Sequence, residues 1–363
     1  MQQLTVTVKR LNKRKLVPVD LSDRSTIIGT VTEGYSFAGT EADVTEVPNQ
    51  ALGKWYKDRD GYFYWGGGVE ETLAVPFTLP AETILGVLDY NSNSLLPAVT
   101  KKTRGDNITI GIVDTGCFIH EAFKNNTVIG KNFIDNNDDF EDTSAQSHGT
   151  FVSGIIIAGE TIDNQMKGIA PAVKLVIAKA TTQSGISNRN ALLEGLKWVI
   201  EQKPDIINCS FDFSPSTDSE RFKNIFTSAD AQKIIWVAAG QDNSGLFNQN
   251  VFYPASLDNF IAVGSLRPDA LGGSSIDKIN PKIKYIMGEG PFISTNRFDL
   301  YSHGVGSSFA SALVAGSLAL IKAHLIKTQH ASDPKDCVNF LDEHIEQLTT
   351  AQQLNTAFSI YKR

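Results

Sequence analysis

The sequence is poor in cysteine, has no excess of basic charge and contains no long unbroken apolar run. Its 363 residues include only three cysteines, Cys117, Cys209 and Cys337, which lack the spacing of a metal site. Because three scattered cysteines do not form a disulfide framework, we expect all of them to be thiols. The 33 lysines and arginines are outnumbered by 40 aspartates and glutamates, so the net charge of -7 gives no electrostatic reason to expect nucleic acid as a partner.

No segment is expected to cross a membrane. The most apolar stretch, residues 309–321, is shorter than the ~20 residues that span a bilayer, and it includes serine and glycine. We therefore expect it to be a buried helix. The first residues of the chain alternate as a strand does and lack the apolar core of a secretory signal. The sequence thus indicates a cytoplasmic protein without a membrane partner.

The residue pattern changes once along the chain, which is long enough for one large domain and a smaller one. Residues 1–97 hold short runs of Val, Thr, Tyr and Phe broken by Gly, Asp and Asn, which predicts a small all-β domain and its connection. Residues 98–106 include a basic run and predict a linker. Over residues 107–363, short apolar strands alternate with helical segments, which predicts an α/β domain with a mostly parallel sheet and helices on both faces.

Residues 55–68 carry the strongest aromatic signal of the first domain. Asp60 and Gly61 lie between two aromatic strands, which is typical of a tight hairpin. The segment resembles the closing strands of bacterial SH3-like domains, and a resemblance over residues 1–75 implies a small SH3-like barrel. The aromatic rings have two interpretations, a surface that binds a partner or the core of the barrel. The core is favoured, because a small barrel has few other large side chains to bury.

Two short motifs place an acid and a base where a parallel sheet exposes side chains, beyond the carboxyl ends of its strands. Residues 113–116 read Val-Asp-Thr-Gly, so Asp114 closes an apolar strand. Such an aspartate is as often a helix cap or a ligand-binding residue, and Asp-Thr-Gly also occurs in aspartic proteases. Residues 147–154 read Ser-His-Gly-Thr-Phe-Val-Ser-Gly, so His148 opens an apolar helix beside a glycine. A lone histidine is usually structural, but this setting gives a general base rigid support with little bulk beside it.

A third motif brings a serine to the start of a helix of small residues. Residues 304–316 read Gly-Val-Gly-Ser-Ser-Phe-Ala-Ser-Ala-Leu-Val-Ala-Gly, and Ser308 lies where the helix begins. A serine at a helix start is usually only an N-cap. A nucleophile also gains from that position, because free backbone N–H groups and the helix dipole stabilise an oxyanion on the attacked carbonyl.

Together the three motifs resemble the signature segments of the subtilisin-like serine proteases, in the family's chain order of Asp, His and Ser. The resemblance implies that Ser308 attacks the scissile carbonyl, that His148 takes and returns the proton, and that Asp114 orients the imidazole. It also implies a subtilisin-like fold from about residue 107 onward, a protein or peptide substrate, and no cofactor.

The same resemblance outlines a substrate groove. A bound peptide is expected to lie extended between two backbone segments, above a pocket whose walls belong to two strands. The residues assigned to substrate binding are Ser184, Gly185, Ile186, Ser210, Phe211, Asp212, Ala238, Ala239 and Gly240.

The sequence departs from the family pattern at the oxyanion site and at the groove. Where the family has an asparagine that binds the oxyanion beside the backbone N–H of Ser308, this chain has Gln241, and a loop shift would bring Asn243 there instead. Asp212 and Phe213 replace a Gly-Gly pair, which should narrow the groove, and the carboxylate favours a basic substrate residue unless it points to solvent. The sequence thus predicts a serine endopeptidase with restricted substrates. The alternative is a catalytically impaired pseudoprotease that acts as a peptide-binding module.

The acidic segment 135–142 reads Asp-Asn-Asn-Asp-Asp-Phe-Glu-Asp and has two interpretations. Hard cations such as calcium prefer several carboxylate oxygens, so the segment could bind calcium. Its spacing does not match a regular calcium loop, which favours a solvated run of charges. We therefore expect no required metal ion.

Overall fold

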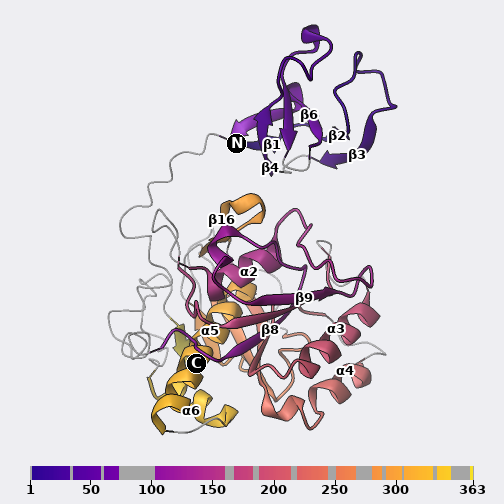
Figure 1. Ribbon diagram of the computed structural model, residues 1–363. Coiled ribbons are helices and arrows are strands. Elements are labelled where there is room, and N and C mark those ends of the chain that lie inside the picture. Colours follow the sequence, from indigo (N-terminus) through magenta and orange to yellow (C-terminus); the bar gives the residue numbers. More distant parts are fainter. Residues whose placement is uncertain are drawn as a thin grey trace. The chain divides into compact units, whose positions relative to one another are not determined.

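The computed structural model of the chain describes the residues given at the end of this sentence: 2–32, 36–58, 61–72, 103–159, 167–182, 188–213, 219–243, 251–266, 280–287, 292–304, 306–329, 333–344 and 360–362. The chain divides into two compact units, residues 1–81 and residues 82–363 (Figure 1). Residues 98–102 of the predicted linker lie outside the described residues. The rest of it is bonded to the second unit, since the N–H of Ala172 donates to the carbonyl of Arg104 at 2.9 Å.

The N-terminal unit is a seven-stranded sheet in which every pair of neighbouring strands is antiparallel. Its strands are β1 (Gln2–Val6), β2 (Arg10–Arg14), β3 (Ile27–Thr32), β4 (Ser36–Glu41), β5 (Trp55–Asp58), β6 (Phe63–Trp65) and β7 (Val69–Thr72), with short 3-10 turns at Gln50–Leu52 and Gly66–Gly68. The strand order is β3-β2-β6-β5-β4-β1-β7, and no pairing among the described residues closes β3 onto β7. The small all-β unit is therefore present, while the described sheet is open and does not confirm an SH3-like barrel.

The aromatic residues of β5 and β6 form the core of this sheet. The two strands pair across a hairpin in which Gly61 has a φ of 83°, as the Asp-Gly pair predicts. Trp55 and Phe63 are at most 5% exposed and pack with Val17 and Val47. These burials confirm the core interpretation of the aromatic rings and contradict that of an exposed aromatic surface.

The second unit is built on an eight-stranded sheet with the order β17-β14-β13-β12-β11-β8-β10-β9. All neighbouring strands are parallel except β14 and β17, so the predicted mostly parallel sheet is confirmed. The strands are β8 (Thr109–Asp114), β9 (Val128–Asn132), β10 (Lys174–Lys179), β11 (Ile206–Cys209), β12 (Ile235–Asn243), β13 (Phe260–Leu266), β14 (Tyr285–Met287) and β17 (Ile360–Lys362). A separate antiparallel pair, β15 (Phe292–Thr295) and β16 (Tyr301–Gly304), is joined by the short turn η6 (Arg297–Asp299).

Helices cover both faces of the parallel sheet. Figure 1 shows α2 and α5 on one face and α3 and α4 on the other. The helices are α2 (His148–Ile157), α3 (Arg189–Glu201), α4 (Ser219–Phe226), α5 (Ser307–Gln329) and α6 (Pro334–His344), with 3-10 turns at η3 (Glu121–Phe123) and η4 (Ala231–Lys233). Because successive side chains of a strand point to opposite faces, Ile112 packs with α2 and α5 while Val113 packs with α3. Two cores therefore hold the central strand β8 in place.

Helix α5 is the buried helix expected from residues 309–321. It is long and apolar enough to span a membrane by length and composition, yet 83% of its apolar window is buried inside the protein. It packs on β11, β12 and β13, which explains its apolar character without a bilayer. The cysteines Cys117, Cys209 and Cys337 are buried free thiols, as predicted.

Candidate active site

Asp114 is held at the carboxyl end of β8, a central strand between β10 and β11. The apolar residues before it anchor the strand in both cores, so the position of the carboxylate is fixed by the fold. Its side chain is only 2% exposed. One oxygen, Oδ1, accepts a hydrogen bond from the N–H of Thr115 at 2.7 Å and forms a 2.8 Å contact with Nδ1 of His148. The carboxylate thus fixes which ring nitrogen faces it, and Nε2 is left for other partners.

His148 is the first residue of α2, and the glycine after it allows the helix to approach β8 closely. A Cβ atom at Gly149 would lie 2.1 Å from the carbonyl oxygen of Gly116. Burial alone lowers the pKa of His148, but the charge and hydrogen bond of Asp114 together with the charge of Asp142 raise it above its ordinary value. The imidazole is therefore a stronger base than a free histidine.

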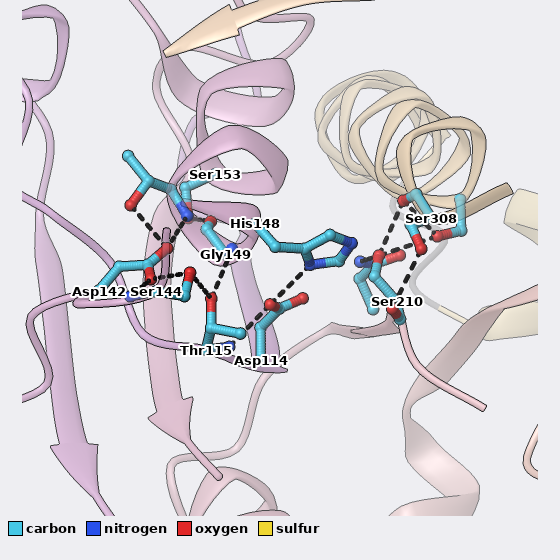
Figure 2. Close-up of polar contacts among 12 residues, drawn as sticks. Asp114, Thr115, Asp142, Ser144, His148, Gly149, Ser153, Ser210 and Ser308 are labelled. Carbon is cyan, nitrogen blue, oxygen red and sulfur yellow. Dashed lines mark hydrogen bonds and ion pairs between the residues drawn. The ribbon is translucent and has the colours of Figure 1, made fainter. Parts of the chain in front are cut away.

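Ser308 lies in the first turn of α5, facing the end of β11 (Figure 2). Its hydroxyl donates to the carbonyl of Ser210 at 3.1 Å. Its own carbonyl accepts from the hydroxyls of Ser210 and Ser311, both at 2.8 Å. Among the described residues, no hydrogen bond joins Ser308 to His148. The hydroxyl must therefore turn about its Cα–Cβ bond before it can share its proton with the imidazole.

One cavity of about 280 Å³ brings the three candidate catalytic residues together. It is lined by Asp114, Thr115, Ser144, Gln146, His148, Thr181, Thr182, Ser210, Phe211, Asp212, Ala239, Ser307 and Ser308. Figure 2 shows the imidazole of His148 between the Asp114 carboxylate and the Ser308–Ser210 pair. An acid, a base and a hydroxyl that arise from distant parts of the sequence thus face one another at the carboxyl edge of the parallel sheet.

The predicted groove residues are only partly found around this cavity. Ser210, Phe211, Asp212 and Ala239 line it, whereas Ala238 is fully buried in the core on the α3 side and Gly240 continues β12. Ser184, Gly185 and Ile186 lie outside the described residues. For Gln241 and Asn243 only the backbone in β12 is described, with a shift of register after Ala239. The assignment of an oxyanion donor among these side chains stays a prediction.

Phe213, which was expected to narrow the groove in place of a glycine, does not line the described cavity. Its side chain is 7% exposed, and its backbone pairs with Tyr253 through bonds of 2.9 and 3.1 Å. Its ring lies 4.7 Å from that of Phe222, so it belongs to the same core as Ala238, on the side of α3 and α4. Of the two replaced glycine positions, only Asp212 lines the cavity, where it is exposed.

The acidic segment 135–142 divides into exposed carboxylates and one that is fully buried. Asp135, Asp138, Asp139 and Glu141 are exposed, as a solvated run predicts. Asp142 is 0% exposed and bonds to the helix that carries His148, a role the sequence did not reveal. In the described part of the chain, no cluster of three or more His, Cys, Asp or Glu residues is arranged to hold a metal ion.

Several polar residues around the cavity were not anticipated. Thr181 and Thr182 follow β10, which pairs with β8 so that Lys179 stands beside Asp114. Neighbouring parallel strands end at the same edge of a sheet, so the residues after β10 must lie near those after β8. This could be predicted only if the strand order were known.

A buried aspartate oriented toward a histidine, beside a serine at a helix N-terminus and at the carboxyl edge of a parallel sheet, is the kind of arrangement that serine peptidases use. Residues 105–353 match the model of the subtilase family, so the chain belongs to the subtilase family and is a serine endopeptidase. The matched segment begins after the N-terminal sheet.

Similar proteins support this membership. The chain is 31% identical to an intracellular serine protease of Paenibacillus polymyxa over 62% of its own length and 70% of the relative's. It is 31% identical to the major intracellular serine protease of Bacillus subtilis (strain 168), over 62% and 71%. It is 32% identical to subtilisin DY of Bacillus licheniformis, over 60% and 77%. The solved structure of prenylagaramide maturation protease PagA matches with a TM-score of 0.57 and 22% identity, over 71% of this chain and 91% of that one, which shows a shared fold.

Proposed function

We propose that the protein hydrolyses peptide bonds through Asp114, His148 and Ser308 and an acyl-enzyme intermediate. The observation that carries the proposal is the 2.8 Å contact between Asp114 and His148 in the cavity that also contains Ser308. A peptide carbonyl in this cavity is attacked by Ser308 Oγ, while Nε2 of His148 takes the hydroxyl proton. The imidazolium is stabilised by Asp114 and then protonates the leaving amine as the C–N bond breaks. A water molecule, deprotonated by His148, then attacks the acyl-enzyme ester, and the C–O bond to Ser308 breaks as the serine regains its proton.

The attack requires a change at the nucleophile. Ser308 Oγ bonds to the carbonyl of Ser210, so it must turn away from β11 toward Nε2. The residues that follow β11 are where an extended substrate would pair. A substrate N–H that donates to the Ser210 carbonyl would replace the serine hydroxyl there and favour its turn toward the base.

The developing oxyanion needs donors near the start of α5. We propose the backbone N–H of Ser308 and the side chain of Gln241, with Asn243 as the alternative to the latter. Loss of one such donor lowers the rate by roughly 10²–10³, against accelerations of at least about 10⁶. If the glutamine side chain could not reach the oxyanion, the enzyme would therefore be slower but still active.

The substrates are proposed to be a restricted set of proteins or peptides. Asp212 and the half-buried Phe211 line the cavity beside the candidate nucleophile. A carboxylate and an aromatic ring at this place favour substrate side chains that can contact both groups. A glycine in place of Asp212 would not make this selection. The chemistry is supplied by side chains of the chain alone, so the reaction calls for no cofactor.

A catalytically impaired protein that uses the groove to bind peptides is the second candidate. It is favoured by the hydrogen bond of Ser308 to Ser210, which holds the hydroxyl away from the base, and by the glutamine at position 241. In such a protein the serine would stay unreactive when a peptide binds.

Labelling with a fluorophosphonate separates the two candidates, because the reagent reacts only with an activated serine. We expect the folded protein to be labelled near neutral pH, and Ser308→Ala to abolish labelling. The exposed Ser22 provides the matched control, and Ser22→Ala should leave labelling unchanged. A folded protein that takes no label would favour the peptide-binding module.

The N-terminal unit is proposed to bind a partner protein, in the manner of the bacterial SH3-like domains that its sequence resembles, and the whole protein to act in the cytoplasm. The relatives named intracellular serine proteases support the location. A partner surface is supported by the apolar side chains of Leu16, Val19 and Leu21, which are at least 40% exposed in the segment between β2 and β3. The net charge of the chain supports neither nucleic acid nor a membrane as partner.

A further inference from the structure

Helix α2, which carries His148, begins without an ordinary N-cap. Ser147 has a φ of 49° and its side chain forms no capping hydrogen bond to the helix. The first N–H groups of a helix lack partners within the helix and need acceptors from elsewhere. Oδ2 of the buried Asp142 accepts from the N–H of Thr150 at 3.1 Å and from its hydroxyl at 3.0 Å. Asp142 therefore replaces the missing cap from outside the helix.

The other oxygen of Asp142 fixes the carboxylate from the opposite side. Oδ1 accepts from the N–H of Ser144 at 3.0 Å and from its hydroxyl at 2.6 Å. The backbone around Asp142 is anchored to the end of β10, because Nζ of Lys179 donates to the carbonyl of Glu141 at 2.7 Å and lies 3.2 Å from the hydroxyl of Thr143. The carboxylate thus has donors on both oxygens and a rigid support.

The same network reaches the residues around Asp114. The hydroxyl oxygen of Thr115 accepts from the N–H of Gly149 at 3.0 Å and lies 3.4 Å from the hydroxyl of Ser144. The N–H of Thr115 in turn donates to the Asp114 oxygen that bonds to His148. Both members of the Asp114–His148 pair are therefore connected to Asp142 through short chains of hydrogen bonds.

We propose that Asp142 is a positioning residue of the active site, which holds the start of α2 against the end of β8 and adds a second negative charge behind the imidazole of His148. The inference rests on the proposed function of His148 as the general base. Asp142 touches no reacting atom and acts through the position and the basicity of that histidine.

The electrostatic part follows from the surroundings of the imidazole. Asp142 contributes to raising the pKa of His148, after the larger contribution of Asp114. Burial raises the pKa of Asp142 itself, while its hydrogen bonds from Ser144 and Thr150 oppose that rise. The elements packed around the imidazole of His148 carry other titratable and charged groups, which are Asp114, Cys117, Asp142, Lys179, Asp212 and Arg297.

The test is the pH dependence of fluorophosphonate labelling of the full chain in wild type and in Asp142→Asn. An asparagine keeps the shape but presents an amide N–H₂ to one pair of donors and removes the charge. We expect the labelling rate to fall by roughly tenfold to 100-fold, since a small displacement of a base has that effect. We also expect the acid midpoint to move to lower pH, because an imidazole with less negative charge nearby is protonated less readily.

Glu141→Gln is the matched control, since it removes a neighbouring charge whose side chain is exposed. It should change neither the rate nor the midpoint. An unchanged rate in Asp142→Asn would overturn the proposal, and so would a lower rate with an unmoved midpoint, because lost packing alone explains that result. If Asp142→Asn does not fold, Ser144→Ala decides, because it removes a donor to Asp142: a slower labelling rate supports the proposal and an unchanged rate overturns it.

The failure of the proposed function has a different signature. A wild-type protein that takes no label refutes the function of Ser308 without testing Asp142. In that case the titration of the His148 ring, followed by NMR in wild type and Asp142→Asn, still measures the contribution of the buried carboxylate. An equal midpoint in the two proteins would overturn the inference, and a lower one in the variant would support it.

Discussion

A methyl group at position 149 should separate the base from its aspartate. Gly149 follows His148 in the first turn of α2, where the helix lies against the turn after β8. The Cβ atom of an alanine would lie 2.1 Å from the carbonyl oxygen of Gly116 and 3.2 Å from Cβ of Asp114. Ordinary contacts of a Cβ atom are 3.4–4 Å, and both neighbours are close to the backbone of a buried turn. The start of α2 must therefore move by about 1 Å away from β8.

The size of the effect follows from that displacement. The Nδ1–Oδ1 distance of 2.8 Å would lengthen beyond the range of a hydrogen bond, so the imidazole would lose its orientation. A misplacement of about 1 Å at a catalytic group lowers the rate roughly 10²-fold. Overpacking at a buried site costs about 1–3 kcal/mol, which is less than the ordinary stability of a domain of about 5–15 kcal/mol. Gly149→Ala should therefore fold and react slowly.

The rate constant for fluorophosphonate labelling, measured beside a thermal melt, checks this prediction. Gly29→Ala is the matched control, because a Cβ atom there would meet nothing within 4 Å. The control should label and melt like wild type. A Gly149→Ala protein that labels at the wild-type rate would show that close contact between α2 and β8 is not needed for the base, and the geometric reasoning would be wrong.

Three further results are expected. Because the pKa of His148 lies above its ordinary value of 6.5, labelling should decline as the pH falls through that raised pKa, and a rate that stays constant down to about pH 5 would contradict the role of the imidazole as base. Asp212→Asn should lower kcat/KM about two- to fivefold for peptides with a lysine near the scissile bond, as an exposed ion pair would, and an equal change for matched leucine peptides would refute the charge argument. Lys322→Met should lower the free energy of unfolding in urea by about 3 kcal/mol, because it leaves the partly buried Asp205 without the ion pair at 2.9 Å. The exposed Lys233→Met serves as its control, and equal midpoints in the two variants would contradict the prediction.

The sequence predicted the parallel sheet and the helices of the second unit because their signals are local. The apolar run that ends at Asp114 can be buried on both faces only in a covered parallel sheet, and the structure has it as β8. Likewise, the small and apolar residues of 309–321 suit a helix that packs closely on several strands, and α5 does so. The motifs of Asp114, His148 and Ser308 were expected beyond the carboxyl ends of parallel strands, and all three residues line the cavity at that edge.

Other features depend on contacts between distant segments and could not be predicted in this way. Asp142 stands in a run of acidic residues whose other carboxylates are exposed, and only the return of that loop over α2 buries it. Phe213 could face the groove or the core, and its backbone pairing with Tyr253 selects the core. The order of the short strands in the N-terminal sheet is set by long-range pairing, which short runs of Val and Thr do not specify.

The measurement that tests the central claim most directly is the mass-spectrometric location of a fluorophosphonate adduct in wild type, His148→Ala and Asp114→Asn. The relay among the three side chains predicts one adduct, on Ser308, that is absent from His148→Ala and forms up to about 10⁴-fold more slowly in Asp114→Asn. An adduct on another serine, or equal labelling of Ser308 in wild type and His148→Ala, would contradict it.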